Sequence, residues 1–194
     1  MRAPEPVLLD GDEIRLEPLA AHHAGGLAEA VARDPDAFSL SGPIGPGGLD
    51  AWVERALDER DAGQRLPFVV VERDSGVVVG SSSYLDIVPA LDRLEIGATW
   101  YGRPWWATRV NPEAKLLLLG HAFDALGARR VALRTDAANE RSRGAIERLG
   151  AQFEGVLRHW ELRPTGEPRD TAFYSILVDE WPAVRAGLEA RLAA

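Results

Sequence analysis

The sequence predicts a mixed α/β fold, with a mostly antiparallel sheet of about seven strands and helices on both faces. Two observations carry this prediction. Segments with apolar residues at every second position alternate with segments in which apolar residues recur every three or four positions. The early strands also follow one another as a meander, whereas a helix separates two later strands, which is typical of a mixed sheet.

The first half of the chain contains four predicted strands and two predicted helices. A strand at 13–18 ends on Pro18, and the turn Asp74-Ser75-Gly76 separates two strands of the meander. The predicted segments are a strand at 13–18, a helix at 20–33, a loop at 38–48, a helix at 49–63, and strands at 68–72, from 77, and at 91–100.

The second half begins with the most apolar predicted helix, at 111–126. A strand at 129–135 and a helix at 139–149 follow it. Two strands at 152–163 and 169–177 are joined by Pro164-Thr165-Gly166-Glu167, which indicates a hairpin. The last helix is predicted at 179–193, with Pro182 in its first turn.

Composition excludes several classes of function. The 194 residues carry a net charge of −8 and no cysteine, which excludes disulfides, thiolate metal sites and a cysteine nucleophile. The four histidines show no metal-ligand spacing, and no apolar run approaches the roughly 20 residues that span a bilayer. We therefore expect a single cytoplasmic domain over residues 1–194 that binds no metal, nucleic acid or membrane.

One junction between a strand and a helix carries candidate chemistry. Glu95-Ile96-Gly97 opens the last part of a predicted strand. The helix that follows is predicted to start with Asn111 as N-cap and Pro112 at its first position. Such a helix start presents free N–H groups that suit a phosphate, and Thr108 and Arg109 stand just before it. An ordinary capped helix is the alternative interpretation of this junction alone.

A second junction makes the pattern specific. Asn139 opens a helix after a strand, and that helix closes with Glu147-Arg148-Leu149-Gly150-Ala151. With these elements in order from Glu95 to Phe153, the chain resembles the GNAT acyltransferases, in particular the RimJ/RimL-like branch. The closing segments 154–158 and 169–175 are also similar to that branch. The resemblance implies the GNAT fold, acetyl-CoA as cosubstrate and transfer of its acetyl group to a primary amine.

The resemblance also implies which residues contact acetyl-CoA. The strand end should expose backbone to the pantetheine arm, the helix start should wrap the pyrophosphate, and the asparagine-led helix should contact pantetheine and nucleotide. The cofactor-binding residues implied are, in that order, Thr99, Trp100 and Tyr101; Thr108, Arg109, Val110 and Asn111; and Asn139, Ser142 and Arg143.

Glu95 is the candidate catalytic residue, because the family often has an acidic residue on this strand and only a deprotonated amine attacks. Asp86 is a weaker candidate for the same role. The chain departs from the family at two places. The phosphate loop 103–110 lacks the usual glycines. Ile146 occupies a position where many members place a tyrosine that protonates the departing thiolate, which implies that the thiolate takes its proton from water.

Two interpretations of function stay open. In the first, the amine attacks the thioester directly in a ternary complex, because no cysteine or serine–histidine motif offers a covalent route. In the second, the chain is a non-catalytic acyl-CoA-binding or sensing domain. Hydrolase and P-loop motifs are absent. The acceptor stays open between a protein N-terminus and a small-molecule amine, selected by loops such as 37–49. A homodimer is compatible with the resemblance.

Overall fold

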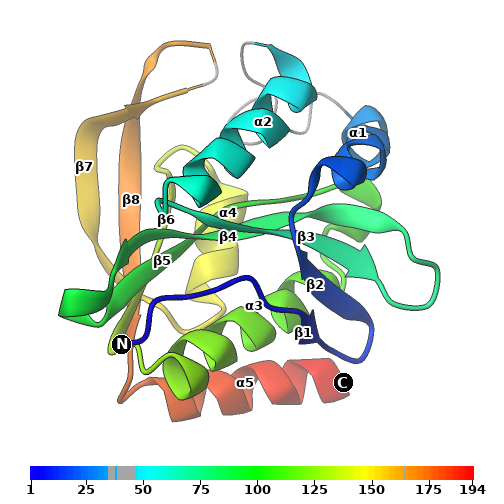
Figure 1. The fold of residues 1–194 in the computed structure, drawn as a ribbon. Coiled ribbons are helices and arrows are strands. Elements are labelled where there is room, and N and C mark those ends of the chain that lie inside the picture. Colours follow the sequence, from blue (N-terminus) through cyan, green and yellow to red (C-terminus); the bar gives the residue numbers. More distant parts are fainter. Residues whose placement is uncertain (35–37, 39–46, 164) are drawn as a thin grey trace.

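The structure, a computed structural model, describes residues 1–34, 38, 47–163 and 165–194. The described strands form one sheet in the order β1-β2-β3-β4-β5-β6-β8-β7. All neighbouring strands are antiparallel except β5 and β6, which run parallel. The predicted fold class is therefore confirmed, with eight strands rather than about seven (Figure 1).

The first half of the chain supplies five strands and two helices. Its elements are β1 (Leu9–Asp10), β2 (Ile14–Pro18), α1 (Ala24–Ala32), α2 (Gly48–Asp61), β3 (Leu66–Glu72), β4 (Val78–Val88) and β5 (Arg93–Tyr101). The predicted loop at 38–48 and the candidate acceptor loop at 37–49 lie largely outside the described residues.

The second half supplies three strands and three helices. Its elements are α3 (Val110–Gly120), β6 (Arg130–Asp136), α4 (Glu140–Glu147), β7 (Gln152–Leu162), β8 (Pro168–Leu177) and α5 (Trp181–Ala193). The β7–β8 pairing confirms the predicted hairpin, although Pro164 of its turn lies outside the described residues.

Three differences from the sequence prediction bear on the course of the chain. The two-residue β1 is too short to show a period and pairs with β2. The strand predicted from Leu91 begins at Arg93, because Pro89–Leu91 form a 3₁₀ turn that ends on Asp92 with φ of 49°. The helix predicted to run to Leu126 is α-helical only to Gly120 and continues as one π-helical segment, His121–Ala125.

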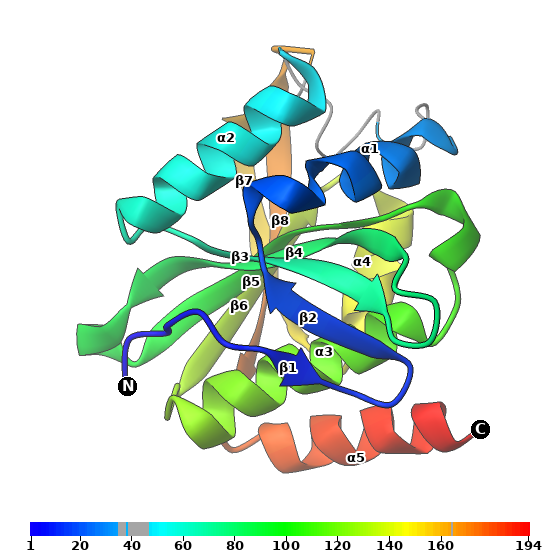
Figure 2. The same cartoon turned by 45° about the vertical axis from the view of Figure 1, so that its right-hand side comes forward.

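Helices cover both faces of the sheet (Figures 1 and 2). On one face, α1 and α2 pack on Val69 and Val71 of β3 and on Trp100 of β5. On the other face, α3 and α5 pack with the end of α4 over a larger cluster that includes Leu94 and Ile96 of β5. Strand β5 therefore contributes to both cores. No helix in the described part of the chain is long and apolar enough to cross a membrane.

Candidate functional site

Strand β5 leaves β6 after the first three of its nine residues. The parallel pairing consists of Arg93 with Arg130, Leu94 with Val131 and Glu95 with Ala132. The antiparallel pairing with β4, in contrast, continues to Tyr101. From Ile96 onward, one edge of β5 has no strand partner among the described residues. The backbone N–H and C=O groups on that edge can therefore bind a ligand in the manner of an added strand.

A β-bulge marks the point of divergence. Ser83 pairs with Gly97 and Ser81 with Trp100, so that one residue of β4 opposes two residues of β5. Ala98 adopts a positive φ of 47°, as bulges often require. A side chain on Gly97 would collide with the carboxylate of Glu95 and with Leu85. The Glu95-Ile96-Gly97 sequence thus leaves room for the carboxylate beside the bulge.

Glu95 is buried, with 3% of its surface exposed, and lies at the last residue pair between β5 and β6. Arg134 of β6 donates from Nε to its carboxylate at 3.0 Å, and the same guanidinium contacts Glu161 at 3.2 Å. Burial raises the pKa of Glu95 to about 7, against the lowering effect of Arg134. At neutral pH this carboxyl can either hold or accept a proton. Asp86, in contrast, is exposed and pairs with Arg93.

A buried lysine lies on the other side of β5. Lys115 of α3 is 4% exposed, and its Nζ donates to Oγ1 of Thr99 at 2.9 Å. The Thr99 hydroxyl also shares a hydrogen bond of 2.7 Å with Ser82. Burial lowers the pKa of Lys115 to about 7, while Glu95 raises it. At neutral pH the group can therefore either hold or give up a proton.

Sequence reasoning missed Lys115, although a signal was present. It is the single lysine of the chain, because the other basic residues counted with lysine are all arginines. It also falls on the apolar stripe of its helix, one position after Ala114 and at i−3 and i−4 from Leu118 and Leu119. A lone lysine on a core-facing stripe indicates a functional role, because the burial of its charge costs stability.

The start of α3 differs from the prediction. The helix begins at Val110 with Arg109 at the N-cap position, two residues before the predicted cap Asn111. The Thr108 hydroxyl accepts from the Val110 N–H at 3.3 Å, and Glu113 N–H already donates to Arg109 O at 3.0 Å. Pro112 fits inside the first turn because that turn does not use its missing N–H.

Arg109 does not point into the gap beside β5 in this structure. Its guanidinium contacts Glu13 at 3.1 Å and donates to Leu192 O at the end of α5. The Arg109 side chain is half exposed, so this ion pair is weak and exchangeable. Its contact with a phosphate stays a prediction.

The start of α4 agrees with the prediction for Asn139. Its Oδ1 accepts from the Ser142 N–H at 3.1 Å, which is the contact of an N-cap. Arg143 donates from Nε to the Tyr174 hydroxyl at 3.0 Å and lies over Phe153. The cofactor contacts expected of these residues stay predictions.

Two arginines meet over one tryptophan between the two helix starts. Trp106 donates from its indole N–H to Tyr101 O at 2.8 Å, at the end of β5. The guanidinium carbon of Arg141 lies 3.2 Å from the ring centroid, and that of Arg103 lies 4.5 Å away. Burial and the nearby Arg103 both lower the pKa of Arg141. Among the described residues, neither arginine forms an ion pair.

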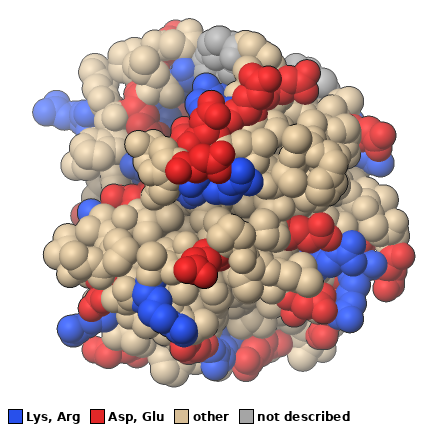
Figure 3. All heavy atoms as spheres, in the orientation of Figure 1, with Lys and Arg blue, Asp and Glu red and all other residues tan. Residues whose placement is uncertain are grey.

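This arginine pair concentrates positive charge that can attract an anion locally. Acidic and basic side chains are interspersed over the face drawn in Figure 3, and the whole chain carries −8. The overall field therefore repels anions, and only local groups can hold one. Arg103 lies in the loop before α3 and Arg141 lies in the first turn of α4. No local sequence pattern predicts that these two segments meet. The ring of Trp106 contacts both guanidinium groups of this pair.

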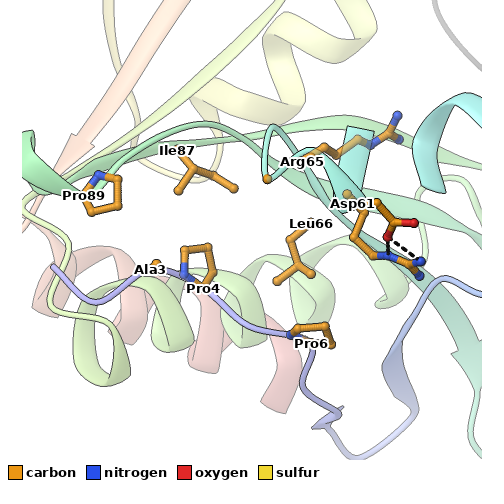
Figure 4. A pocket seen from close by; sticks show the side chains of 10 residues that line it. Ala3, Pro4, Pro6, Asp61, Arg65, Leu66, Ile87 and Pro89 are labelled. Atoms are coloured by element: carbon orange, nitrogen blue, oxygen red, sulfur yellow. Dashed lines mark hydrogen bonds and ion pairs between the residues drawn. The ribbon is translucent and has the colours of Figure 1, made fainter. Parts of the chain in front are cut away.

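One hollow of about 390 Å³ lies elsewhere, under the N-terminal segment (Figure 4). Ala3, Pro4 and Pro6 form one wall, and Leu66 and Ile87 form another. Arg60 and Asp61 at its rim pair with each other at 2.7 Å. The lining offers no nucleophile or free carboxylate, so it adds nothing to the chemistry beside β5. The described residues also contain no group of side chains that suits a metal ion.

Comparisons with known proteins agree with this geometry. The acetyltransferase (GNAT) domain family model matches residues 13–152. The uncharacterized N-acetyltransferase p20 of Bacillus licheniformis is 28% identical over 119 residues, 61% of this chain and 66% of that protein. The chain spans 57% to 66% of the curated relatives it matches.

Solved structures match over nearly the whole chain. A GCN5-related N-acetyltransferase from Brucella melitensis is 34% identical with a TM-score of 0.84, covering 97% of this chain and 86% of that one. RimJ of Mycobacterium smegmatis, solved in complex with CoA-disulfide, is 22% identical with a TM-score of 0.78, covering 92% and 88% of the two chains. The second likeness shows a common fold.

Proposed function

Because the chain belongs to the GNAT acetyltransferase family, we propose that it moves an acetyl group from acetyl-CoA to a primary amine. The observation that carries the proposal is the divergence of β5 from β6, with a buried carboxyl at the point where the strands part. A non-catalytic domain would need the free strand edge for binding, but it would not need a carboxyl whose pKa lies near 7.

The residues present fit the cofactor. The free edge of β5 at Thr99, Trp100 and Tyr101 suits the amide groups of the pantetheine arm. The first turns of α3 and α4 suit phosphate, and Arg103 and Arg141 add charge between them. We assign the cofactor-binding set as Thr99, Trp100, Tyr101, Thr108, Arg109, Val110, Asn111, Asn139, Ser142 and Arg143, together with Arg103 and Arg141. When bound, acetyl-CoA supplies the thioester that the amine attacks.

Glu95 acts on the acceptor in this proposal. An alkyl ammonium must lose a proton before its nitrogen can attack, and the ionised Glu95 carboxylate accepts that proton directly or through water. Arg134 orients the carboxylate through its Nε contact. Since the pKa of Glu95 is about 7, the fraction ready to act as base rises with pH through neutrality. The net charge of −8 also favours the approach of a cationic amine.

The acceptor is proposed only as a class, a primary amine on a protein N-terminus or on a small molecule. The putative ribosomal N-acetyltransferase YdaF of Bacillus subtilis is 31% identical over 106 residues, and it is the reason for including protein acceptors. The loop that would select the acceptor lies largely outside the described residues.

The test is a panel of amines with acetyl-CoA, in which the released thiol is detected with a disulfide dye. The chain has no cysteine, so the dye reports CoA thiol with no background from the protein. We expect turnover with at least one amine, and a loss of rate in Glu95→Gln that is larger at neutral than at high pH. Glu154→Gln is the matched control, because Glu154 pairs with Arg130 on the sheet away from Glu95's partners. Tight acetyl-CoA binding without turnover on any amine would favour the sensing domain.

A further inference from the structure

We propose that Lys115 donates the proton that the CoA thiolate takes up as it leaves, a role that rests on the function proposed above. In this role Lys115 takes the place of the tyrosine that Ile146 replaces. Four features of the structure support the assignment: the choice of residue, its burial, its place at the strand edge, and its separation from Glu95.

Lysine is the only basic residue with a long side chain that readily gives up a proton, whereas arginine stays charged in proteins. Every lysine or arginine of this chain is an arginine except residue 115. The exception is 4% exposed and lies on α3 among core residues. An arginine at this position could bind an anion but could not act as an acid.

The hydrogen bonds of Lys115 leave donors free. An ammonium has three N–H groups, and the structure gives one of them to Thr99. Among the described residues, no carboxylate forms an ion pair with Lys115. A buried cation with two unused donors is costly unless a further polar partner arrives. A thiolate formed during the reaction would be such a partner.

The position of Thr99 brings this ammonium to the gap. Thr99 lies four residues beyond the last pair of β5 with β6, on the stretch whose free edge we assign to the pantetheine arm. The thioester sulfur is attached to the end of that arm. A donor held by Thr99 therefore lies at the segment of β5 along which we place the arm that carries the sulfur.

Lys115 and Glu95 approach β5 from opposite faces. Leu94 and Ile96 point into the core beneath α3, so Glu95 between them points to the other face. Lys115 reaches Thr99 from α3 itself. This arrangement separates an acid on the α3 side from a base on the opposite side, and it prevents the two groups from neutralising each other in an ion pair.

The proton transfer is balanced at each atom. The amine nitrogen bonds to the carbonyl carbon, the C–S bond breaks, and its electron pair goes to sulfur. An Nζ proton of Lys115 moves to the sulfur, and the proton lost by the amine goes to Glu95 or to water. Solvent then reprotonates Lys115 and deprotonates Glu95. The pKa of Lys115, about 7, lies below the ordinary thiol value of about 8.5, so the transfer is favourable.

The test measures the thiol of bound CoA by the ultraviolet absorbance of its thiolate between pH 5 and 10. We compare the wild type with two variants. Lys115→Met removes the charge, whereas Lys115→Arg keeps the charge but cannot give up a proton to the thiolate. Lys115→Met should move the thiolate curve to higher pH by one unit or more. Lys115→Arg should keep it near the wild-type position. Both variants should lower kcat by about 10²-fold, the usual contribution of an acid.

The outcomes separate the two proposals. A thiolate curve unchanged by Lys115→Met, or full activity in Lys115→Arg, overturns the role of Lys115 while CoA binding itself still supports the family function. Failure of the wild type to bind CoA overturns both. If Lys115→Met does not fold, the role of Lys115 can still be tested on the wild type alone. Its single lysine gives one Nζ resonance after ¹⁵N labelling, and a lysine pKa that CoA binding leaves unchanged overturns the proposal.

Discussion

Replacement of Glu95 by glutamine should make the folded protein more stable at alkaline pH while lowering its activity. Glutamine is close to glutamate in shape, and its amide oxygen can still accept from Arg134. The substitution removes only the need to ionise a group that is 3% exposed. A catalytic carboxyl in a buried position thus predicts opposite effects on stability and on rate.

The sign and size follow from linkage between pKa and stability. The pKa of Glu95 is raised in the folded state, so its stabilising contribution is complete below about pH 4.5 and is lost as the pH rises through about 7. A rise from 4.5 to about 7 corresponds to about 3 kcal/mol as an upper limit. Glu95→Gln should therefore equal the wild type in stability near pH 5 and exceed it by 1–3 kcal/mol near pH 9.

The assay is urea unfolding of both proteins at five pH values between 5 and 9. Glu154→Gln is the control, because the hydrogen bond from Arg130 lowers the pKa of Glu154 and the sign is reversed. That variant should be no more stable than the wild type at any of these pH values. A difference between Glu95→Gln and the wild type that is constant with pH would refute the reasoning. So would a loss of stability that grows toward pH 9.

Three further predictions follow from the site. Arg141→Ala should raise the Kd for acetyl-CoA about tenfold by calorimetry, the size of a lost charged hydrogen bond of about 1.5–3 kcal/mol, and Arg109→Ala should do the same if its exposed pair with Glu13 exchanges for phosphate. Gly80→Ala should lower the free energy of unfolding by about 1–3 kcal/mol, because the new Cβ would meet the Trp100 carbonyl of β5; an unchanged urea midpoint would contradict this. Double-reciprocal plots at several amine concentrations should intersect, as a ternary complex requires, whereas parallel lines would indicate an acetyl-enzyme.

The order of elements could be predicted because each long element shows its own period. The alternation of apolar and polar residues identified β2, the β-branched run identified β3, and the apolar composition identified α3. Boundaries were less secure where two signals competed. Asn111 and Pro112 together looked like a cap and a first position, yet the helix begins at Val110, whose N–H donates to the Thr108 hydroxyl. The spacing of apolar residues alone does not reveal at which polar residue the helix begins.

The site was predictable only in part, for a physical reason. Glu95 and Asn139 could be proposed because each stands at a junction whose local sequence resembles the family. The contact between Trp106 and Arg141 joins segments separated by α3 and β6, and no local pattern encodes it. Lys115 stands out in the composition as the single lysine, but it belongs to no motif of the family.

The two buried ionisable groups beside β5 together cost the folded state most stability near neutral pH. The cost of Lys115 is complete below about pH 7 and fades as the pH rises toward 10.5, because burial lowers its pKa from 10.5 to about 7. The cost of Glu95 is complete above about pH 7 and fades as the pH falls toward 4.5, because burial raises its pKa to about 7. Apolar side chains at both positions would avoid these costs. The two groups flank the segment where β5 has left β6, where backbone groups also lack strand partners. A fold that needed only stability would close this gap, whereas a fold that must bind a thioester and move two protons needs it open.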